Sequence, residues 1–245
     1  SNRTRLSFEV GIQKMGGHSV FIHGSDVQFG EREPMSHGSR VMSRYFDLII
    51  YRTKDHRLLE SLAKYSSIPI VNGLSDVSHP CQALADAYTI QQHFGSFDDV
   101  HLTYIGDAAN NVCKSLMDIS KQCGFSMAIV APKKYMPKHV PDGIEVSSDV
   151  SSVISKTNVI YTDVWVSMGD EANAEERCND LANYQVNDAL MALARKDCIL
   201  LHCLPANLGQ EVTESVFESK ASKVFDLAEN RLDAQNGLLA WLMQS

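Results

Sequence analysis

The sequence predicts an α/β protein of two lobes, each with a mainly parallel sheet flanked by helices, and with the active site in the cleft between them. Short apolar, β-branched runs alternate with helical patterns, as in sheets whose strands are joined by helical crossovers. A turn-rich stretch at residues 95–99 follows a long helical pattern and divides the chain. Two α/β lobes joined by a helix imply a cleft, which is a usual place for a ligand.

Seven runs have the composition expected of strands. The run at Asp47–Tyr51 is almost continuously apolar, which fits a strand covered on both faces. The complete set of expected strands is Ser19–His23, Asp47–Tyr51, Pro69–Asn72, Val100–Gly106, Ser126–Val130, Asn158–Val164 and Cys198–Leu204.

Helical spacing of apolar residues occurs between these strands. Helices are expected to begin near Leu6 and to cover His56–Tyr65, Cys81–His93, Asn111–Cys123, Asp188–Arg195 and Arg231–Met243. Residues 1–95 are expected to form the first domain and residues 96–230 the second. Residues 231–245 are expected to form a closing helix that packs back across the domain junction.

Composition narrows the class of protein. The 245 residues carry a formal charge of −8, which argues against nucleic-acid binding because that function needs a cationic surface. No apolar run is long enough to cross a bilayer, so no membrane partner is expected. The six cysteines include no C-x-x-C pair, which favours a reducing, cytoplasmic location. No secretory leader is visible, but the chain starts at Ser1 without a methionine, so further sequence is expected upstream and targeting stays open.

The first chemical motif is Ser1-Asn2-Arg3-Thr4-Arg5, directly before an expected helix. Hydroxyls, backbone N–H groups and a guanidinium at a helix N-terminus can bind an anion. Taken alone, these residues favour a different interpretation, namely a solvated capping segment, which is the commoner case.

The second motif is His79-Pro80-Cys81-Gln82. Proline in the first helical turn leaves His79 outside the helix, with its ring able to point into a cleft. A neutral imidazole and the Gln82 amide could then hydrogen-bond a carbonyl oxygen that gains negative charge. A lone His-Pro pair is more often an ordinary helix start.

Two further motifs follow apolar strands, at the sheet edge where ligands collect in such folds. Asp163 begins the motif Asp163–Gly169, and its carboxylate could hold an ammonium group. Cys203 lies in the motif Leu201–Ala206, where it is either a buried thiol or a contact to a reacting amine. The strand–turn–helix at Tyr104–Asn111 lacks the glycines of a dinucleotide-binding fingerprint, so no nicotinamide cofactor is expected.

Together these motifs resemble those of the aspartate/ornithine carbamoyltransferase family over nearly the whole chain. Ser1–Arg5 and His79–Gln82 match its carbamoyl phosphate signature, with Asn2 standing where threonine is usual. Asp163–Gly169 and His202–Pro205 match the ornithine-specific members rather than the aspartate-specific ones. The resemblance implies transfer of a carbamoyl group from carbamoyl phosphate to the δ-amine of L-ornithine, giving L-citrulline and phosphate.

The resemblance also implies a role for each matching residue. Arg3, His79, Gln82, Cys203 and Arg231 are the expected catalytic residues. Carbamoyl phosphate is expected to contact Ser1, Asn2, Arg3, Thr4, Gln28, Arg52, His79, Gln82, Cys203, Leu204 and Arg231, with Gln28 reaching a neighbouring subunit's site. Ornithine is expected to contact Asn111, Asp163, Ser167 and Met168.

Neither a cofactor nor a metal ion is expected, and the family pattern implies a homotrimer or a multiple of trimers with shared active sites. A role in arginine metabolism follows, although synthesis and breakdown are not distinguished. Two alternatives stay open. One is transfer to another amine, such as putrescine or an acylated ornithine, and the other is a non-catalytic member of the family.

Overall fold

The computed structural model describes residues 2–24, 33–166 and 171–244. The chain forms two compact units. The first comprises residues 1–81 and 231–245, and the second comprises residues 82–230. Helix α10 (Val224–Leu242) begins in the second unit and continues into the first. The expected domain boundary near residue 95 and the expected packing of the last helix across the junction stay predictions.

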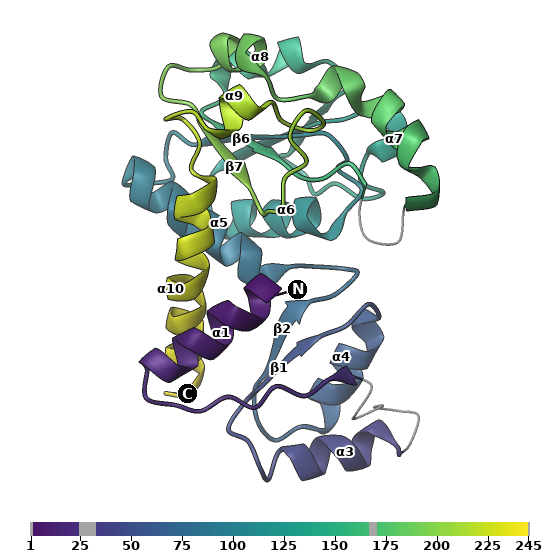
Figure 1. Ribbon diagram of the computed structural model, residues 1–245, viewed down its shortest axis with the longest axis vertical. Coiled ribbons are helices and arrows are strands. Elements are labelled where there is room, and N and C mark those ends of the chain that lie inside the picture. The colour runs from purple at the N-terminus through teal and green to yellow at the C-terminus, as the bar shows by residue number, and fades with distance from the viewer. Residues whose placement is uncertain (1, 25–32, 167–170, 245) are drawn as a thin grey trace. The chain divides into compact units, whose positions relative to one another are not determined.

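The first unit has a parallel pair of strands, β1 (Ile49–Arg52) and β2 (Ile70–Leu74), in which Ile50 lies opposite Val71. Helix α1 (Asn2–Lys14) and the end of α10 cover one face (Figure 1), where Phe8, Val71 and Leu239 form a buried cluster. Helices α3 (Met35–Met42) and α4 (His56–Tyr65) pack against each other on the opposite face. The end of β1 therefore presents Arg52 beside the start of α1.

Local sequence explains where α4 and α6 (Asn111–Cys123) begin and end. Asp55 caps α4 by accepting a hydrogen bond from the Arg57 backbone N–H at 3.0 Å. Asn110 caps α6 by accepting one from the Cys113 N–H at 2.8 Å. Helix α6 ends at Gly124, whose φ of 81° is the left-handed conformation that glycine adopts without strain.

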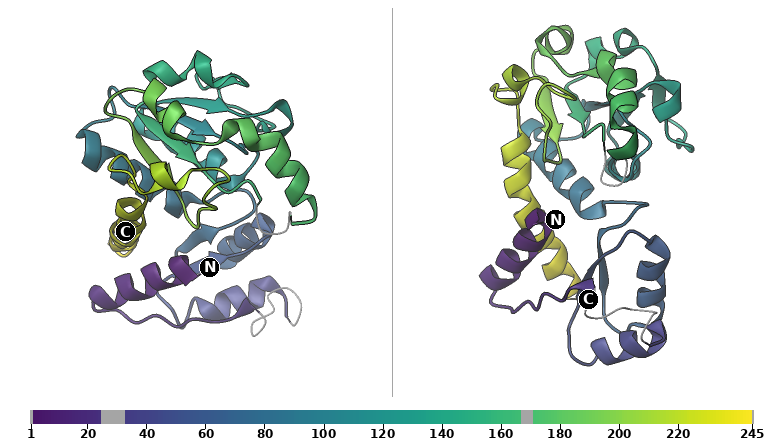
Figure 2. Two further views of the ribbon diagram at one scale, coloured as in Figure 1. Left: turned by 45° about the horizontal axis from the view of Figure 1, so that its top comes forward. Right: turned by 45° about the vertical axis from the view of Figure 1, so that its right-hand side comes forward.

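The second unit has a five-stranded parallel sheet in the order β5-β4-β3-β6-β7. Helices enclose it on both faces, with α6 on one and α8 (Asp188–Leu193) and α9 (Glu214–Phe217) on the other (Figures 1 and 2). The strands are β3 (His101–Ile105), β4 (Ser126–Val130), β5 (Glu145–Ser147), β6 (Val159–Thr162) and β7 (Ile199–His202). Strands β6 and β7 are buried at every residue, as their apolar sequences predict.

The remaining elements are helical and lie mostly between the strands. Helix α5 (Pro80–Phe94) starts at the end of the first unit, and α7 (Ala174–Leu181) follows β6. The 3₁₀ turns are η1 (Lys133–Tyr135), η2 (Val150–Ser152), η3 (Ile154–Lys156), η4 (Glu171–Asn173) and η5 (Ala182–Tyr184). Within the described ranges, no helix combines the length and apolarity that a membrane span requires.

Three sequence expectations need correction. Residues 19–23 form no strand, and Val20, Phe21 and Ile22 are 67%, 46% and 37% exposed. A strand needs a neighbour for its backbone hydrogen bonds, and the described part of the first unit's sheet pairs β1 only with β2. Helix α1 begins at Asn2 rather than near Leu6, and α10 begins at Val224 rather than at Arg231.

Candidate active site

Two arginines of the first unit converge on one hydroxyl group. The Arg52 Nη1 donates to Thr4 Oγ1 at 3.3 Å, and the Arg231 Nη2 reaches the same oxygen at 3.5 Å. Burial, together with the positive charge of Arg231, lowers the pKa of Arg52. Two partly desolvated guanidinium groups repel each other, and a bound anion would remove that repulsion. The cluster is therefore suited to a phosphate group.

Arg231 is held in place from its own helix. Its Nε and Nη2 donate to Gln235 Oε1 at 3.0 and 2.9 Å, and the Gln235 Nε2 donates to Ser7 Oγ on α1 at 2.9 Å. Gln235 is fully buried. Sequence reasoning missed Gln235, although its position four residues after Arg231 on one helix could have indicated it.

His79 lies just before α5 and is 6% exposed. Burial, together with the charges of Arg231 and Arg52, lowers the pKa of His79 to about 3. The imidazole is consequently neutral near pH 7. It can donate a hydrogen bond to a developing oxyanion but is not a reservoir of protons.

Gln82 is the first residue of the second unit, and its amide is oriented by a buried carboxylate. The Gln82 Nε2 donates to Asp86 Oδ1 at 2.9 Å, and the Tyr161 hydroxyl donates to the same oxygen at 3.3 Å. Asp86 is fully buried. The contact turns the Gln82 amide nitrogen toward Asp86 and links α5 to β6, the strand that leads to Asp163.

Asp163 and Cys203 meet at the carboxyl ends of β6 and β7. The Cys203 thiol donates to Asp163 Oδ1 at 3.1 Å, and the Val164 N–H donates to the same oxygen at 2.8 Å. Burial raises the pKa of the Asp163 carboxyl. A buried carboxylate held by neutral donors gains free energy from a nearby ammonium group, so this edge is suited to a cationic ligand.

The segment after Cys203 is fixed by a buried pair. Leu204 has a φ of 58°, and the Leu204–Pro205 bond is cis. The Leu204 N–H donates to His202 Nδ1 at 2.8 Å, while His202 Nε2 lies 3.0 Å from Glu211 Oε1. Because Nδ1 accepts, the ring proton is on Nε2 and is donated to Glu211. Sequence reasoning missed Glu211, which no motif marked.

A metal ion is a second possible use of this edge. Among the described residues, Asp163, His202 and Cys203 offer ligand atoms within 4.8 Å of one another. Both ring nitrogens of His202 are already hydrogen-bonded, so binding a metal there would break one of these contacts. The geometry thus favours an organic cation over a metal, and we assign no metal site.

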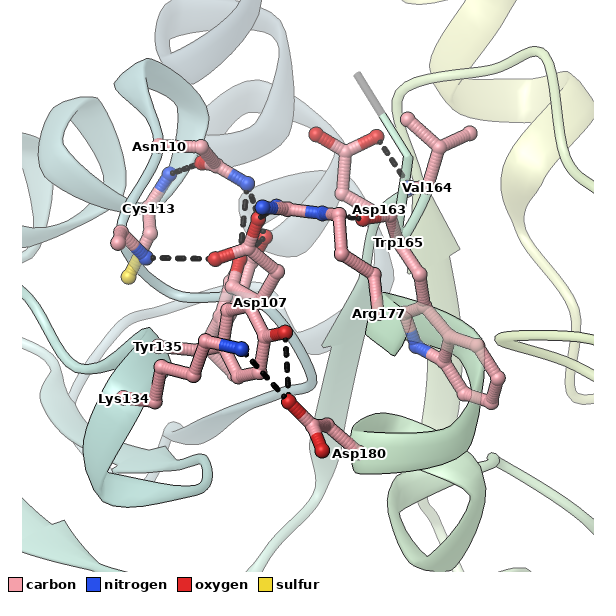
Figure 3. Close-up of polar contacts among 12 residues, drawn as sticks. Asp107, Asn110, Cys113, Lys134, Tyr135, Asp163, Val164, Trp165, Arg177 and Asp180 are labelled. Carbon is pink, nitrogen blue, oxygen red and sulfur yellow. Dashed lines mark hydrogen bonds and ion pairs between the residues drawn. The ribbon is translucent and has the colours of Figure 1, made fainter. Parts of the chain in front are cut away.

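The same edge of the sheet continues at the β3–α6 turn, where Asn110 (Figure 3) directly precedes Asn111. The Asn110 side chain is occupied by capping α6 and by donating to Tyr104 and to the Asp107 carbonyl. Asn111, the first residue of α6, is the one of the two that was expected to contact a ligand.

Family models match both parts of the chain. The carbamoyl phosphate-binding domain of aspartate/ornithine carbamoyltransferases matches residues 1–92, and their aspartate/ornithine-binding domain matches residues 98–242. The chain belongs to the aspartate/ornithine carbamoyltransferase family. The expected resemblance is thereby confirmed.

Individual members of this family are similar over most of their length. The ornithine carbamoyltransferase of Methanobrevibacter smithii is 44% identical over 98% of this chain and 83% of its own. That of Archaeoglobus fulgidus is 41% identical over 99% of this chain and 81% of its own. The solved structure of the Pyrococcus furiosus ornithine carbamoyltransferase superposes with a TM-score of 0.94 at 42% identity, covering 100% of this chain and 82% of that one.

The structure of this carbamoyltransferase family member brings together some of the expected site residues. Thr4, Arg52 and Arg231 form one cluster. The charges of both arginines also lower the pKa of His79. Asp163 and Cys203 form another. Asn2 and Arg3 lie exposed on the first turn of α1, and Leu204 is half-buried. Four of the expected residues lie outside the described ranges, namely Ser1, Gln28, Ser167 and Met168.

Proposed function

We propose that this protein is an ornithine carbamoyltransferase, which transfers the carbamoyl group of carbamoyl phosphate to the δ-amine of L-ornithine. The observation that carries the proposal is the opposite charge of its two residue clusters. Arg52 and Arg231 are suited to a phosphate, whereas Asp163 is suited to an ammonium. The names of the related proteins support the same reaction.

The charge of Asp163 favours ornithine over aspartate as the second substrate. Aspartate carries an additional carboxylate, which a cationic residue would have to bind. A buried carboxylate at that place would repel it, whereas the same carboxylate attracts an amino acid with a second amine.

In the proposed mechanism, carbamoyl phosphate binds with its phosphate at Thr4 and Arg52, supported by Ser1, Asn2 and Arg3. Arg3, Thr4, His79 and Gln82 polarise the carbonyl oxygen, and Arg231 balances its growing negative charge. Cys203 and Leu204 lie at the carbamoyl group, and Gln28 reaches in from a neighbouring subunit. Ornithine binds with its α-ammonium near Asp163 and its α-carboxylate near Asn111, Ser167 and Met168. Both substrates must meet for transfer, so the proposal requires the residues of the two units to act on one pair of molecules.

The chemical step needs no covalent enzyme intermediate. The neutral δ-amine forms a bond to the carbonyl carbon, the bond from that carbon to the phosphate oxygen breaks, and the amine proton passes to the departing phosphate. The products are citrulline and phosphate. Cys203 would position the amine, and its thiol is already held by Asp163. The proposal includes no metal ion or organic cofactor.

We further propose a homotrimer, or a multiple of trimers, in the cytoplasm, with a role in arginine biosynthesis. The family resemblance supports the assembly and the pathway, and the free cysteines support a reducing compartment.

One comparison of substrates tests the function. Formation of the carbamoylated amine, which is citrulline when ornithine is supplied, is measured for the protein with ornithine, putrescine, aspartate and acetylornithine at equal concentration and saturating carbamoyl phosphate. Turnover with ornithine should exceed that with every other amine by at least about a hundredfold, since a misplaced charge or a missing polar contact has a large effect. Faster turnover of another amine would replace ornithine as the substrate. Absence of turnover with all four would indicate a non-catalytic family member.

A further inference from the structure

One arginine outside the expected site connects the two segments on which the ornithine-side residues lie. Arg177 is on α7, and its Nη2 forms an ion pair with Asp107 Oδ2. Its Nε donates to the backbone carbonyl of Trp165 at 2.7 Å. Figure 3 shows the guanidinium between these two partners. A single planar group thus connects the segment that follows β3 to the segment that follows β6.

Asp107 is the buried partner of this ion pair, and Arg177 is mostly covered. The side chains of Arg177 and Asp107 are 16% and 4% exposed. The other carboxylate oxygen of Asp107 accepts a hydrogen bond from the Ala109 N–H at 3.1 Å. Removing one partner would leave a charge in a place with little water, so the surrounding backbone would have to shift.

Helix α7 is anchored a second time, which holds Arg177 in register. The Asp180 carboxylate accepts hydrogen bonds from the Tyr135 hydroxyl at 2.9 Å and from the Lys134 Nζ at 3.0 Å. The Arg177 guanidinium lies 5.1 Å from the centre of the Tyr135 ring. Arg177 therefore has little freedom to follow a displaced partner.

The contacts of Arg177 lie next to the residues expected to bind ornithine. Trp165 follows Asp163 after one intervening residue, and Asp107 begins the turn that leads to Asn111. We propose that Arg177, with Asp107 as its partner, is a positioning residue that sets the distance between the Asp163 and Asn111 segments and thereby determines the affinity for the amino-acid substrate. The inference rests on the proposed function.

The test compares R177Q with R195Q by steady-state kinetics and thermal unfolding. Arg195 is a matched control because it also forms an ion pair within the second unit, but its partners Asp99 and Asp197 lie at the surface. R177Q should raise the KM for ornithine by about tenfold or more, because a charged hydrogen bond is lost. Its KM for carbamoyl phosphate should stay within about twofold of the original value, and R195Q should leave both constants unchanged.

Two conservative variants keep the test decisive. R177K retains the charge toward Asp107 but lacks the forked geometry, so its KM for ornithine should lie between those of the original protein and R177Q. If R177Q yields no folded protein, R177K and D107N provide the measurement. An unchanged KM for ornithine in folded variants would overturn the inference, as would an equal rise of both KM values. Failure of the unaltered protein to form citrulline would instead refute the proposed function.

Discussion

At the scale of single residues, the first unit places two positively charged side chains near a histidine that stays neutral. His79 is 6% exposed, and the positive charges of Arg52 and Arg231 both lower its pKa. The protein can keep these three side chains together because the imidazole stays neutral and the guanidinium groups contact the Thr4 hydroxyl. Such an arrangement is unfavourable without an anion, which is why it indicates a binding site rather than a structural one.

The low pKa of His79 predicts a loss of stability in mild acid. In the folded protein the pKa is about 3, whereas the unfolded chain binds the proton near its ordinary value of about 6.5. The unfolded state thus binds more protons between these limits, and stability falls as pH decreases through this window. From pH 7 to pH 5 the His79 share of the loss is about 2 kcal/mol.

Urea unfolding of the unaltered protein and of H79Q at both pH values checks this. Glutamine does not titrate, so the decrease in unfolding free energy between pH 7 and pH 5 should be smaller in H79Q by about that amount. Equal decreases in the two proteins would show that His79 is protonated in the folded state.

Asp163 and Cys203 should differ in their effect on ornithine. D163N removes a buried charge that faces an ammonium, an interaction worth about 1.5–3 kcal/mol, so the KM for ornithine should rise by about tenfold to a hundredfold. C203S keeps a small polar donor to Asp163 and should be slower but active. Steady-state kinetics decide the order. A dead C203S enzyme with a carbamoyl–thiol adduct in mass spectrometry would reveal covalent catalysis instead.

At the scale of elements, the sequence predicts the helices and strands whose bounds are determined by neighbouring residues. Helix α6 has its capping Asn110 and its terminal Gly124, and the predicted bounds of α6 agree with the structure. The expected strands from residue 47 onward coincide with observed ones, and the apolar runs of β6 and β7 are buried on both faces. The run at residues 19–23 is also apolar but pairs with no strand among the described residues, and composition alone does not reveal that.

The short strand β5 (Glu145–Ser147) is an observed strand that was not among the predicted ones. It is an edge strand with two exposed residues, so it carries no apolar signal. The same limit applies to the site. The sequence motifs identify the residues expected to touch substrates, whereas Gln235, Asp86, Glu211 and Arg177 act on those residues through contacts that only the fold creates.

Gly106 directly follows β3, at a position where the backbone favours glycine. Its φ is 124°, and an added Cβ would lie 3.3 Å from the Trp165 Nε1. G106A should therefore lower the free energy of unfolding through both backbone strain and displacement of Trp165, by about 2–4 kcal/mol. G124A is the matched control, because Gly124 also has a positive φ but has no atom within 4 Å of such a Cβ. Urea unfolding should show a smaller loss for G124A, and equal losses would argue against the Trp165 contact.

At the scale of the whole molecule, net charge and local charge have opposite signs. The chain carries a formal charge of −8, yet its first unit gathers Arg52 and Arg231 within reach of one hydroxyl. An acidic exterior with a confined cationic site disfavours long polyanions such as nucleic acids, which need an extended basic surface, but admits a small phosphate compound. The negative net charge thus disfavours large polyanions, and the local arginine cluster favours the binding of a small anion.

The proposed trimer with shared sites predicts complementation between two inactive variants. Q28A lacks the residue expected to reach a neighbouring site, and R52Q lacks an anion contact in its own site. In randomly mixed trimers, a site is intact when its own subunit is Q28A and its neighbour is R52Q, which occurs for about a quarter of the sites. Mixing the two variants in equal amounts should therefore restore up to about a quarter of the original activity.

The matched control mixes R52Q with the double variant Q28A/R52Q, in which every site lacks Arg52 and no activity should return. Sedimentation of the separate variants confirms that each is a folded trimer, and mass spectrometry of subunits of different isotopic mass confirms exchange. Because restored activity requires residues of two chains at one site, its absence after confirmed exchange would mean that each subunit holds a complete site of its own.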